Sequence, residues 1–117
     1  MNIIVAGGRE FTNYPLLRDQ LDFLFQNLVK EELVIISGTA KGADTLAIQY
    51  ATERGIKLIK MPANWDKYKK RAGFIRNQEM ANIADGLVAF WDGRSRGTAH
   101  MIETINSIGK KCRVVRY

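Results

Sequence analysis

Three glycine-bearing turns carry most of the residues in this sequence that could do chemistry. They cover residues 7–11, residues 37–44 and residues 92–98, and each follows a short apolar run. Glycine lets backbone amides approach a bound group closely, and amides at the start of a helix favour an anion. Hydroxyl groups and aspartates in the second and third turns add hydrogen-bonding capacity. The expected chemistry is therefore the binding of a phosphate-bearing ligand by backbone amides.

The second turn is the richest of the three in hydrogen-bonding groups. It is not a P-loop, because the order G-x-x-x-x-G-K-[ST] is absent. We expect the amides of residues 38–43 to surround a phosphate, with nearby hydroxyl groups as further donors. Two interpretations of Asp44 stay open: an acid that favours a helix N-terminus, or an acceptor for a ribose hydroxyl. The candidate ligand-binding residues of the three turns are Gly7, Gly8, Arg9, Phe11, Ser37, Gly38, Thr39, Ala40, Gly42, Asp44, Asp92, Gly93, Ser95, Gly97 and Thr98.

Two candidates for catalysis stand out, although the sequence leaves enzymatic activity open. Arg76 begins a polar triplet with Asn77 and Gln78 inside an otherwise apolar helical pattern, and its guanidinium fork matches phosphate. A salt bridge from Arg76 to Glu79 or Asp44 is the alternative. Asp92 either binds ligand hydroxyls or closes an Asp-Gly turn. We expect Arg76, Asn77 and Asp92 to contact the ligand.

Positive charge is concentrated in the second half of the chain. Residues 1–56 carry 5 basic and 7 acidic side chains, whereas residues 57–117 carry 13 basic and 5 acidic ones. Trp65 and Tyr68 stand beside the basic residues 67–71, a combination that can stack a base and hold its phosphates. The alternative for Trp65 is a cover for the edge of the core. The asymmetry indicates an anionic partner, either a nucleotide-like small molecule or a nucleic acid.

Several classes of protein are not expected from this composition. The single cysteine excludes an internal disulfide, and the single histidine has no second one with which to form a metal site. We therefore expect no metal and no cofactor. No apolar run reaches the ~18 residues of a membrane span, and the N-terminal residues do not resemble a signal peptide. We expect a cytoplasmic protein with no membrane partner.

Strand and helix patterns alternate along the chain and predict a single domain over residues 1–117. Strands are expected at residues 3–6, 33–36, 56–61, 87–91 and 112–117, with residues 63–71 irregular. Asn13 or Thr12 would begin the first helix, Gly55 would end the second, and Thr98 would cap the last. Expected core residues of the last two helices are Ile75, Met80, Ala81, Ile83, Ala84, Met101, Ile102, Ile105 and Ile108. The pattern indicates an α/β, Rossmann-like three-layer fold with a mostly parallel five-stranded sheet of order 3-2-1-4-5.

Five short motifs appear in order and cover nearly the whole chain. They are Gly8-Arg9-x-Phe11, Ser37-Gly38-x-Ala40-x-Gly42-Ala43-Asp44, Pro62-Ala63-x-Trp65, Ala72-Gly73-x-x-Arg76-Asn77-x-x-Met80 and Trp91-Asp92-Gly93-x-Ser95-x-Gly97-Thr98. Together they resemble the YspA/YpsA-related branch of the SLOG superfamily, whose relatives include the SMF/DprA and LOG proteins. The resemblance implies a Rossmann-like fold, a bacterial or phage source, a homo-oligomer and a nucleotide-derived ligand such as an ADP-ribose, NAD-like or signalling nucleotide.

The similarity to the LOG phosphoribohydrolases is partial. Arg76-Asn77-x-x-Met80 resembles their Arg-Lys-x-x-Met helix, but Met101 follows Gly97-Thr98 at the place where those enzymes carry a glutamate. Cleavage of an N-glycosidic bond needs a carboxylate, so Asp92, Glu10 or Asp44 would have to replace it. Three functions follow: binding or sensing of a nucleotide-derived ligand, hydrolysis of a nucleotide by an N-glycosidase, and binding of single-stranded nucleic acid.

Overall fold

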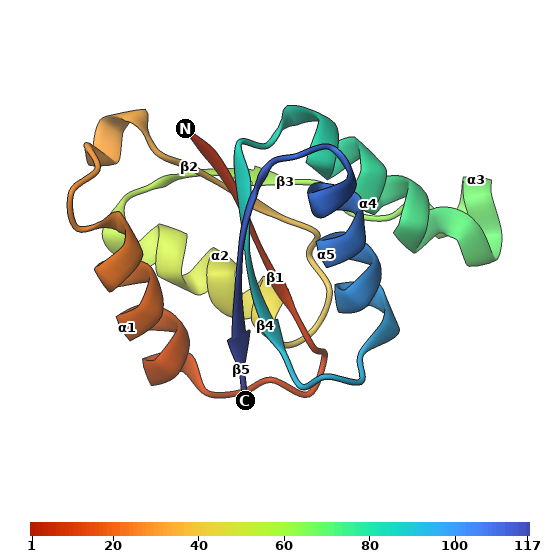
Figure 1. Cartoon of the computed structure of the whole chain (residues 1–117), viewed down its shortest axis with the longest axis horizontal. Coiled ribbons are helices and arrows are strands. Elements are labelled where there is room, and N and C mark those ends of the chain that lie inside the picture. Colours follow the sequence, from red (N-terminus) through yellow and green to blue (C-terminus); the bar gives the residue numbers. More distant parts are fainter.

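Five parallel strands form one sheet at the centre of the computed structural model, which describes residues 1–117. The strands are β1 (Asn2–Gly7), β2 (Val34–Ser37), β3 (Lys57–Lys60), β4 (Gly86–Trp91) and β5 (Lys111–Arg116). Their order is β3-β2-β1-β4-β5, and every neighbouring pair is parallel (Figure 1). The predicted α/β fold and strand order are confirmed. The mostly parallel sheet that the sequence indicated is parallel throughout.

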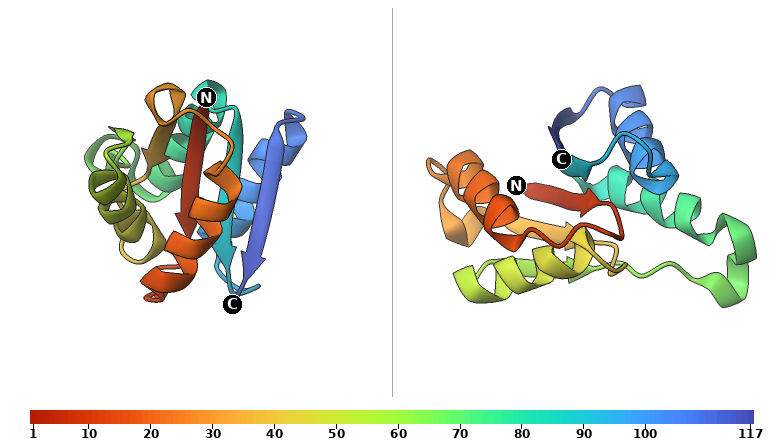
Figure 2. Two further views of the ribbon diagram at one scale, coloured as in Figure 1. Left: turned by 90° about the vertical axis from the view of Figure 1, so that its left-hand side faces the viewer. Right: turned by 90° about the horizontal axis from the view of Figure 1, so that it is seen from below.

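Helices cover both faces of the sheet. They are α1 (Tyr14–Phe25), α2 (Ala43–Arg54), α3 (Trp65–Tyr68), α4 (Ala72–Ile83) and α5 (Arg96–Ser107), with 3-10 turns at Lys30–Glu32 and Lys69–Arg71. Helices α1 and α2 lie against one face and α4 and α5 against the other, while the short α3 projects from the end of α4 (Figures 1 and 2). None of these helices is both long enough and apolar enough to cross a bilayer.

The core consists of two apolar layers, one on each side of the sheet. Alternate residues of β1 divide between them: Ile3 and Val5 pack with α1 and α2, whereas Ile4 and Ala6 pack with α4 and α5. This division follows from the two-residue period of a strand, and a parallel sheet covered on both faces buries both sets. The chain therefore reads as continuous apolar runs at β1, β2 and β4.

The predicted helix ends agree with the structure in part. Asn13 caps α1 by accepting from the Leu16 amide at 3.1 Å, and Gly55 ends α2 with a left-handed φ of 65°. Thr98 does not cap α5, because the helix already begins at Arg96 after Ser95, and Thr98 is buried in its first turn. Residues 63–71 were expected to be irregular, yet Asn64 caps the short helix α3.

Two residues expected in the core are exposed. Ile83 is 44% exposed because it points away from the buried face of α4, which is formed by Met80 and Ala81. Ile108 is 43% exposed because α5 ends at Ser107 and the backbone then leaves the helical path. A 3.6-residue period identifies a face only while the helix continues.

Candidate functional site

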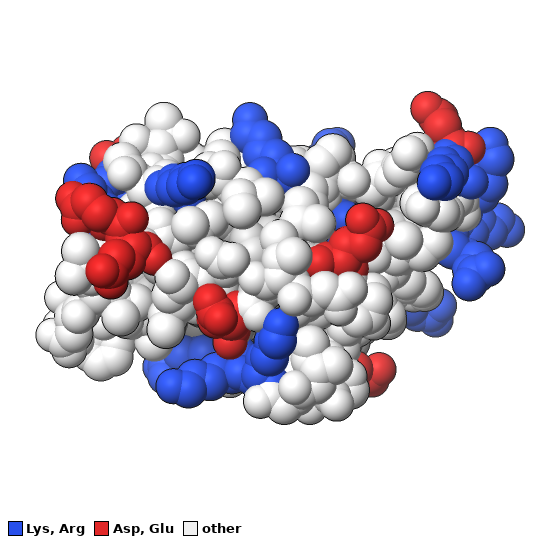
Figure 3. Space-filling model, turned by 90° about the horizontal axis from the view of Figure 1, so that it is seen from above, with Lys and Arg blue, Asp and Glu red and all other residues white.

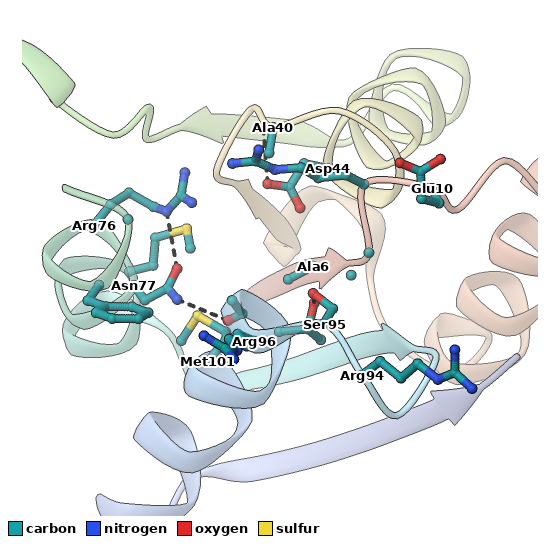
Figure 4. A pocket seen from close by; sticks show the side chains of 18 of the residues that line it. Ala6, Glu10, Ala40, Asp44, Arg76, Asn77, Arg94, Ser95, Arg96 and Met101 are labelled. Carbon is teal, nitrogen blue, oxygen red and sulfur yellow. Dashed lines mark hydrogen bonds between the residues drawn. The ribbon is translucent and has the colours of Figure 1, made fainter. Parts of the chain in front are cut away.

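A cavity of about 540 Å³ opens at the carboxyl edge of the sheet, where the three glycine-bearing turns meet (Figure 4). The turn after β1 supplies one wall, the start of α2 a second, and α4 with the start of α5 the remainder. In a doubly wound sheet this edge lies beside β1 and β4, where the strand order reverses. The topology thus brings together turns that are far apart in the sequence.

Most of the predicted ligand-binding residues line this cavity. They are Gly7, Gly8, Arg9, Ala40, Asp44, Trp65, Arg76, Asn77, Asp92, Ser95, Gly97 and Thr98. The other six predicted residues do not line it. They are Phe11, Ser37, Gly38, Thr39, Gly42 and Gly93.

Three of these six residues hold the turns against one another. Phe11 is buried, and its ring packs 5.1 Å from the ring of Phe90, so it belongs to the core. Gly42 lies so close to the first turn that a Cβ there would overlap the carbonyl oxygen of Gly8. The hydroxyl of Ser37 is also buried and donates to the backbone oxygen of Asp44 at 2.9 Å. These residues position the site without facing its interior.

Arg76 is the most unusual charged residue of the cavity. Its Nε donates to the Asn77 side-chain oxygen at 3.1 Å, and its Nη1 donates to the Gly38 carbonyl oxygen at 2.5 Å. The salt bridge to Glu79 or Asp44, which was the alternative interpretation, is absent, because the ion pairs of the structure are Arg18–Asp19 and Arg54–Asp22. Burial lowers the pKa of Arg76, the charge of the nearby Asp44 opposes this shift, and the neighbouring Arg9 lowers the pKa further. The guanidinium thus faces the cavity without a carboxylate partner.

Asp44 stands close to this arginine and is almost fully buried. Burial raises the pKa of Asp44 to about 6, although the hydrogen bond from the Ala40 amide and the charge of Arg76 oppose the shift. Gly38 fits between the two charged groups only because it has no side chain. A Cβ there would lie 2.6 Å from Arg76 Nη1 and 2.9 Å from Asp44 Oδ2.

Three of the six backbone amides of residues 38–43 are bonded within the chain. Thr39 donates to the Ser37 hydroxyl at 3.2 Å, Ala40 donates to Asp44 at 3.1 Å, and the amide of Ala43 donates to Gly8. The expected phosphate nest at residues 38–43 is therefore not open in the way the sequence indicated. Local side-chain acceptors bind the amides of Thr39 and Ala40, and the Gly8 carbonyl oxygen binds that of Ala43.

The third turn keeps more of its amides free. Asp92 Oδ1 accepts from the amides of Arg94 at 2.8 Å and Ser95 at 2.9 Å, and these bonds lower the pKa of Asp92. Asp92 therefore closes the turn, as one of its two interpretations proposed. The amides at the start of α5 precede its first internal hydrogen bonds and have no partner in the chain. They belong to Arg96, Gly97 and Thr98.

Sequence reasoning missed part of the cavity wall. Phe74 is 50% exposed there, and it resembled an ordinary apolar residue of a helix. Lys70, Arg94 and Arg96 also line the cavity. The available signal was the basic segment 67–71 for Lys70 and the third glycine-bearing turn for the two arginines. Lys and Arg side chains gather at the end of the molecule formed by α3, beyond Trp65 (Figure 3).

The charge of the cavity favours an anion. Five cationic side chains line it, against three carboxylates, of which Asp92 is bonded within its own turn and Asp44 is partly protonated near neutral pH. No group of three His, Cys, Asp or Glu side chains is arranged to hold a metal ion. The arrangement can bind phosphate groups through a guanidinium and helix amides.

Comparison with known proteins agrees with the fold. The model of the YspA, cpYpsA-related SLOG family matches residues 1–68. The Gene 61 protein of Mycobacterium phage D29 is 36% identical over 114 aligned residues, and the match covers 92% of this chain and 90% of the phage protein. DNA processing protein A (DprA) of Streptococcus pneumoniae matches with a TM-score of 0.78 and 22% identity, over 99% of this chain and 50% of that one. The Helicobacter pylori DNA processing protein A matches with a TM-score of 0.70 and 19% identity, over 100% of this chain and 66% of that one. This chain thus spans half to two thirds of those two proteins, and at such identities the likeness shows the fold alone.

Proposed function

This chain belongs to the YspA, cpYpsA-related SLOG family, and we propose that its cavity binds a nucleotide-derived ligand through the phosphate groups of that ligand. The ligand class includes ADP-ribose, NAD-like molecules and signalling nucleotides. A volume of about 540 Å³ is within the range of small-molecule sites. The proposal concerns binding or sensing, and cleavage of the ligand is treated separately below.

The observation that carries this proposal is the environment of the Arg76 guanidinium, namely its burial and its hydrogen-bond acceptors. It is half-buried and donates only to two neutral oxygens, those of Gly38 and Asn77. The nearby Asp44 is partly protonated near neutral pH and forms no ion pair with Arg76. A half-buried cation without a bonded counter-charge is costly, and an anionic ligand in the cavity would provide that charge. Guanidinium groups bind phosphate oxygens through two parallel hydrogen bonds, so phosphate suits this position.

The start of α5 supports the same ligand chemistry independently. Its first three amides are free, and a helix of 12 residues adds the positive end of its dipole. The hydroxyl groups of Ser95 and Thr98 lie 3.1 Å apart at the same end and can donate to a phosphate oxygen. Phosphate groups could therefore be bound from two sides of the cavity.

Aromatic side chains at the cavity mouth support a base as the other part of the ligand. Trp65 and Phe74 are each 50% exposed, although large aromatic residues usually bury most of their surface. Trp65 lies beside Gly73 on the wall, where a Cβ on Gly73 would be in van der Waals contact with the indole ring at 3.6 Å. An exposed aromatic face beside cations can stack a nucleobase.

The test is to titrate the purified chain with AMP, ADP-ribose, NAD and inorganic phosphate, following thermal unfolding and calorimetric heat. Ligand at one hundred times its Kd should stabilise the fold by about 2.7 kcal/mol. We expect ADP-ribose or NAD to raise the unfolding midpoint, and phosphate alone to do so only at much higher concentration. If none of the nucleotides shifts the midpoint at millimolar concentration, the proposal is wrong.

Single-stranded nucleic acid is a second candidate ligand. DNA processing protein A of Helicobacter pylori binds single-stranded DNA. In this chain, the exposed Trp65 and the basic residues Lys67–Arg71 continue outward from the cavity mouth. Binding along that surface would weaken steeply with salt, with a slope set by the number of phosphates contacted. An oligothymidylate titration at two salt concentrations, repeated with Lys69→Ala, separates this candidate from a nucleotide held inside the cavity.

Hydrolysis of the bound nucleotide at its N-glycosidic bond is the remaining alternative. Glu10 and Asp44 are the carboxylates of the wall that are not bonded within the third turn. Such an enzyme needs one of them near the ribose C1′ carbon. Chromatography of the titration samples decides the question, because an enzyme releases free base and a sensor returns the nucleotide intact.

A further inference from the structure

Asn77 occupies the junction between two elements of the cavity wall. It lies on α4, is 5% exposed, and uses both ends of its side-chain amide within the chain. Its oxygen accepts from Arg76 Nε at 3.1 Å. Its nitrogen donates to the Gly97 carbonyl oxygen at 3.3 Å and lies 3.1 Å from Nδ1 of His100, both on α5. The dashed lines of Figure 4 mark the bonds to Arg76 and to α5.

We propose that Asn77 is a positioning residue, which holds the Arg76 guanidinium in a fixed relation to the N-terminus of α5. An amide can do this because it accepts at one end and donates at the other. The Gly38 carbonyl accepts from Arg76 Nη1 and the Asn77 side chain accepts from Nε, so these two bonds fix the orientation of the remaining N–H groups of the guanidinium. The effect on ligand binding rests on the proposed function, whereas the effect on Arg76 does not.

The arrangement explains why the guanidinium does not turn to Asp44. Without Asn77, the Gly38 carbonyl would be the single acceptor holding Arg76, and rotation about the side chain would bring its charge toward that carboxylate. An ion pair inside the chain would then compete with an anionic ligand. Asn77 therefore also keeps the positive charge available. Asn77 itself has both amide hydrogens bonded within the chain and contributes little to direct recognition of a phosphate.

The first experiment needs no ligand. In ¹H–¹⁵N spectra of the full chain, the Nε–H signal of Arg76 is assigned by its loss in Arg76→Lys, and its exchange with water is measured. We expect slow exchange in the wild type and in Gln78→Ala, and fast exchange in Asn77→Leu. Gln78→Ala is the matched control, because it removes a neighbouring amide that bonds only to Asn82 on the exposed side of α4. Slow exchange in Asn77→Leu would overturn the proposal.

A second variant tests the oxygen and the nitrogen of the Asn77 amide separately. It also serves if Asn77→Leu does not fold. Asn77→Asp keeps an oxygen next to Arg76 and removes both donors to α5. We expect the Arg76 Nε–H to remain protected, while the amide signals of Gly97 and Thr98 move. Protection lost at Arg76, or unmoved α5 signals, would contradict the assigned geometry.

The consequence for binding is measured by calorimetry with ADP-ribose in a double-mutant cycle. We expect Asn77→Leu to weaken binding by about tenfold when Arg76 is present and by much less in the Arg76→Ala background. Equal losses in both backgrounds would mean a structural role unrelated to Arg76. If the wild type does not bind ADP-ribose, the proposed function fails, and the exchange experiment still decides the role of Asn77.

Discussion

Two half-buried arginines on helices of this molecule differ in their hydrogen-bond partners. Arg54 on α2 donates to both oxygens of Asp22, from Nε at 3.1 Å and from Nη2 at 2.8 Å, and Tyr50 donates to the same carboxylate at 2.7 Å. Arg76 on α4 donates only to the neutral oxygens of Gly38 and Asn77. The pKa of Arg54 is raised by its bond to Asp22, whereas burial lowers the pKa of Arg76.

The difference separates a structural cation from one that is available to a ligand. The Arg54 cluster satisfies its own charge and joins α1 to α2, so it has no need of a further partner. The Arg76 cluster has hydrogen bonds of fixed geometry but no ion pair with the nearby Asp44, and it faces a cavity. A cation that is hydrogen-bonded only to neutral groups can still gain energy by binding an anion directly.

Removal of the Arg76 side chain gives the largest expected effect. Arg76→Ala should weaken the binding of ADP-ribose by about a hundredfold, near 2.7 kcal/mol, since a buried charge-assisted contact is lost. Calorimetry measures the affinity, and thermal unfolding of the free variant should show no loss of stability. Arg54→Ala is the matched control and should do the reverse, lowering stability with unchanged affinity. If Arg76→Ala binds ADP-ribose normally, Arg76 is not a ligand-binding cation and the proposed difference between the two clusters is wrong.

Asp44→Asn sharpens the comparison by removing the nearest negative charge from Arg76. The folded pKa of Asp44 is about 6, above its usual value of 3.8. This group therefore favours the folded state fully below pH 3.8, and that stability is lost as pH rises through 6. The neutral variant should be more stable than the wild type by about 2 kcal/mol at pH 7.5 and no more stable at pH 3.5. Denaturant unfolding across this range measures the difference.

Asp44→Asn should also change how ligand affinity depends on pH near pH 6. Wild-type affinity for ADP-ribose should fall as pH rises through 6, because Asp44 becomes an anion beside the binding site. The affinity of Asp44→Asn should stay level, and the bridging phosphates of ADP-ribose do not titrate there. Parallel pH profiles in the two proteins would show that Asp44 is not the group responsible.

Tyr50→Phe tests the other cluster with a smaller effect. It removes the hydroxyl that donates to Asp22 at 2.7 Å and leaves the buried ring in place. The free energy of unfolding should fall by about 1 kcal/mol, the net worth of one hydrogen bond. Calorimetric affinity for ADP-ribose should not change, because this cluster does not line the cavity. A loss of affinity would indicate that the two faces of the sheet are coupled.

The fold and the meeting of the turns could be predicted because they depend on local and periodic signals. Apolar runs of strand length, each followed by a glycine turn and a helical pattern, allow few topologies once right-handed crossovers are required. The partners of individual groups could not be predicted. For Arg76 the sequence offered a phosphate or a carboxylate as partner, but it did not indicate the backbone carbonyl to which Arg76 donates, because the position of that carbonyl depends on the conformation of the second turn. Homo-oligomer formation stays a prediction.

The second turn illustrates the same limit for backbone groups. Its residues were expected to surround a phosphate with amides, and Ala40 and Asp44 do line the cavity. The amides of Thr39 and Ala40, however, donate to side chains of the same turn. A sequence identifies which residues could form a nest, but it does not reveal which donors the native turn leaves free.

Gly97→Ala carries the smallest expected change in stability and tests the second anion-binding element. A Cβ at this position would meet nothing within 4 Å, and alanine favours a helix, so stability should rise by about 0.5 kcal/mol. The added methyl group would nevertheless stand on the cavity wall, beside amides that we expect to contact a phosphate. Affinity for ADP-ribose should therefore fall while the unfolding midpoint rises, a combination that damage to the fold cannot produce. Unchanged affinity would mean that the free amides of α5 do not contact the ligand and that Arg76 alone binds its phosphate groups.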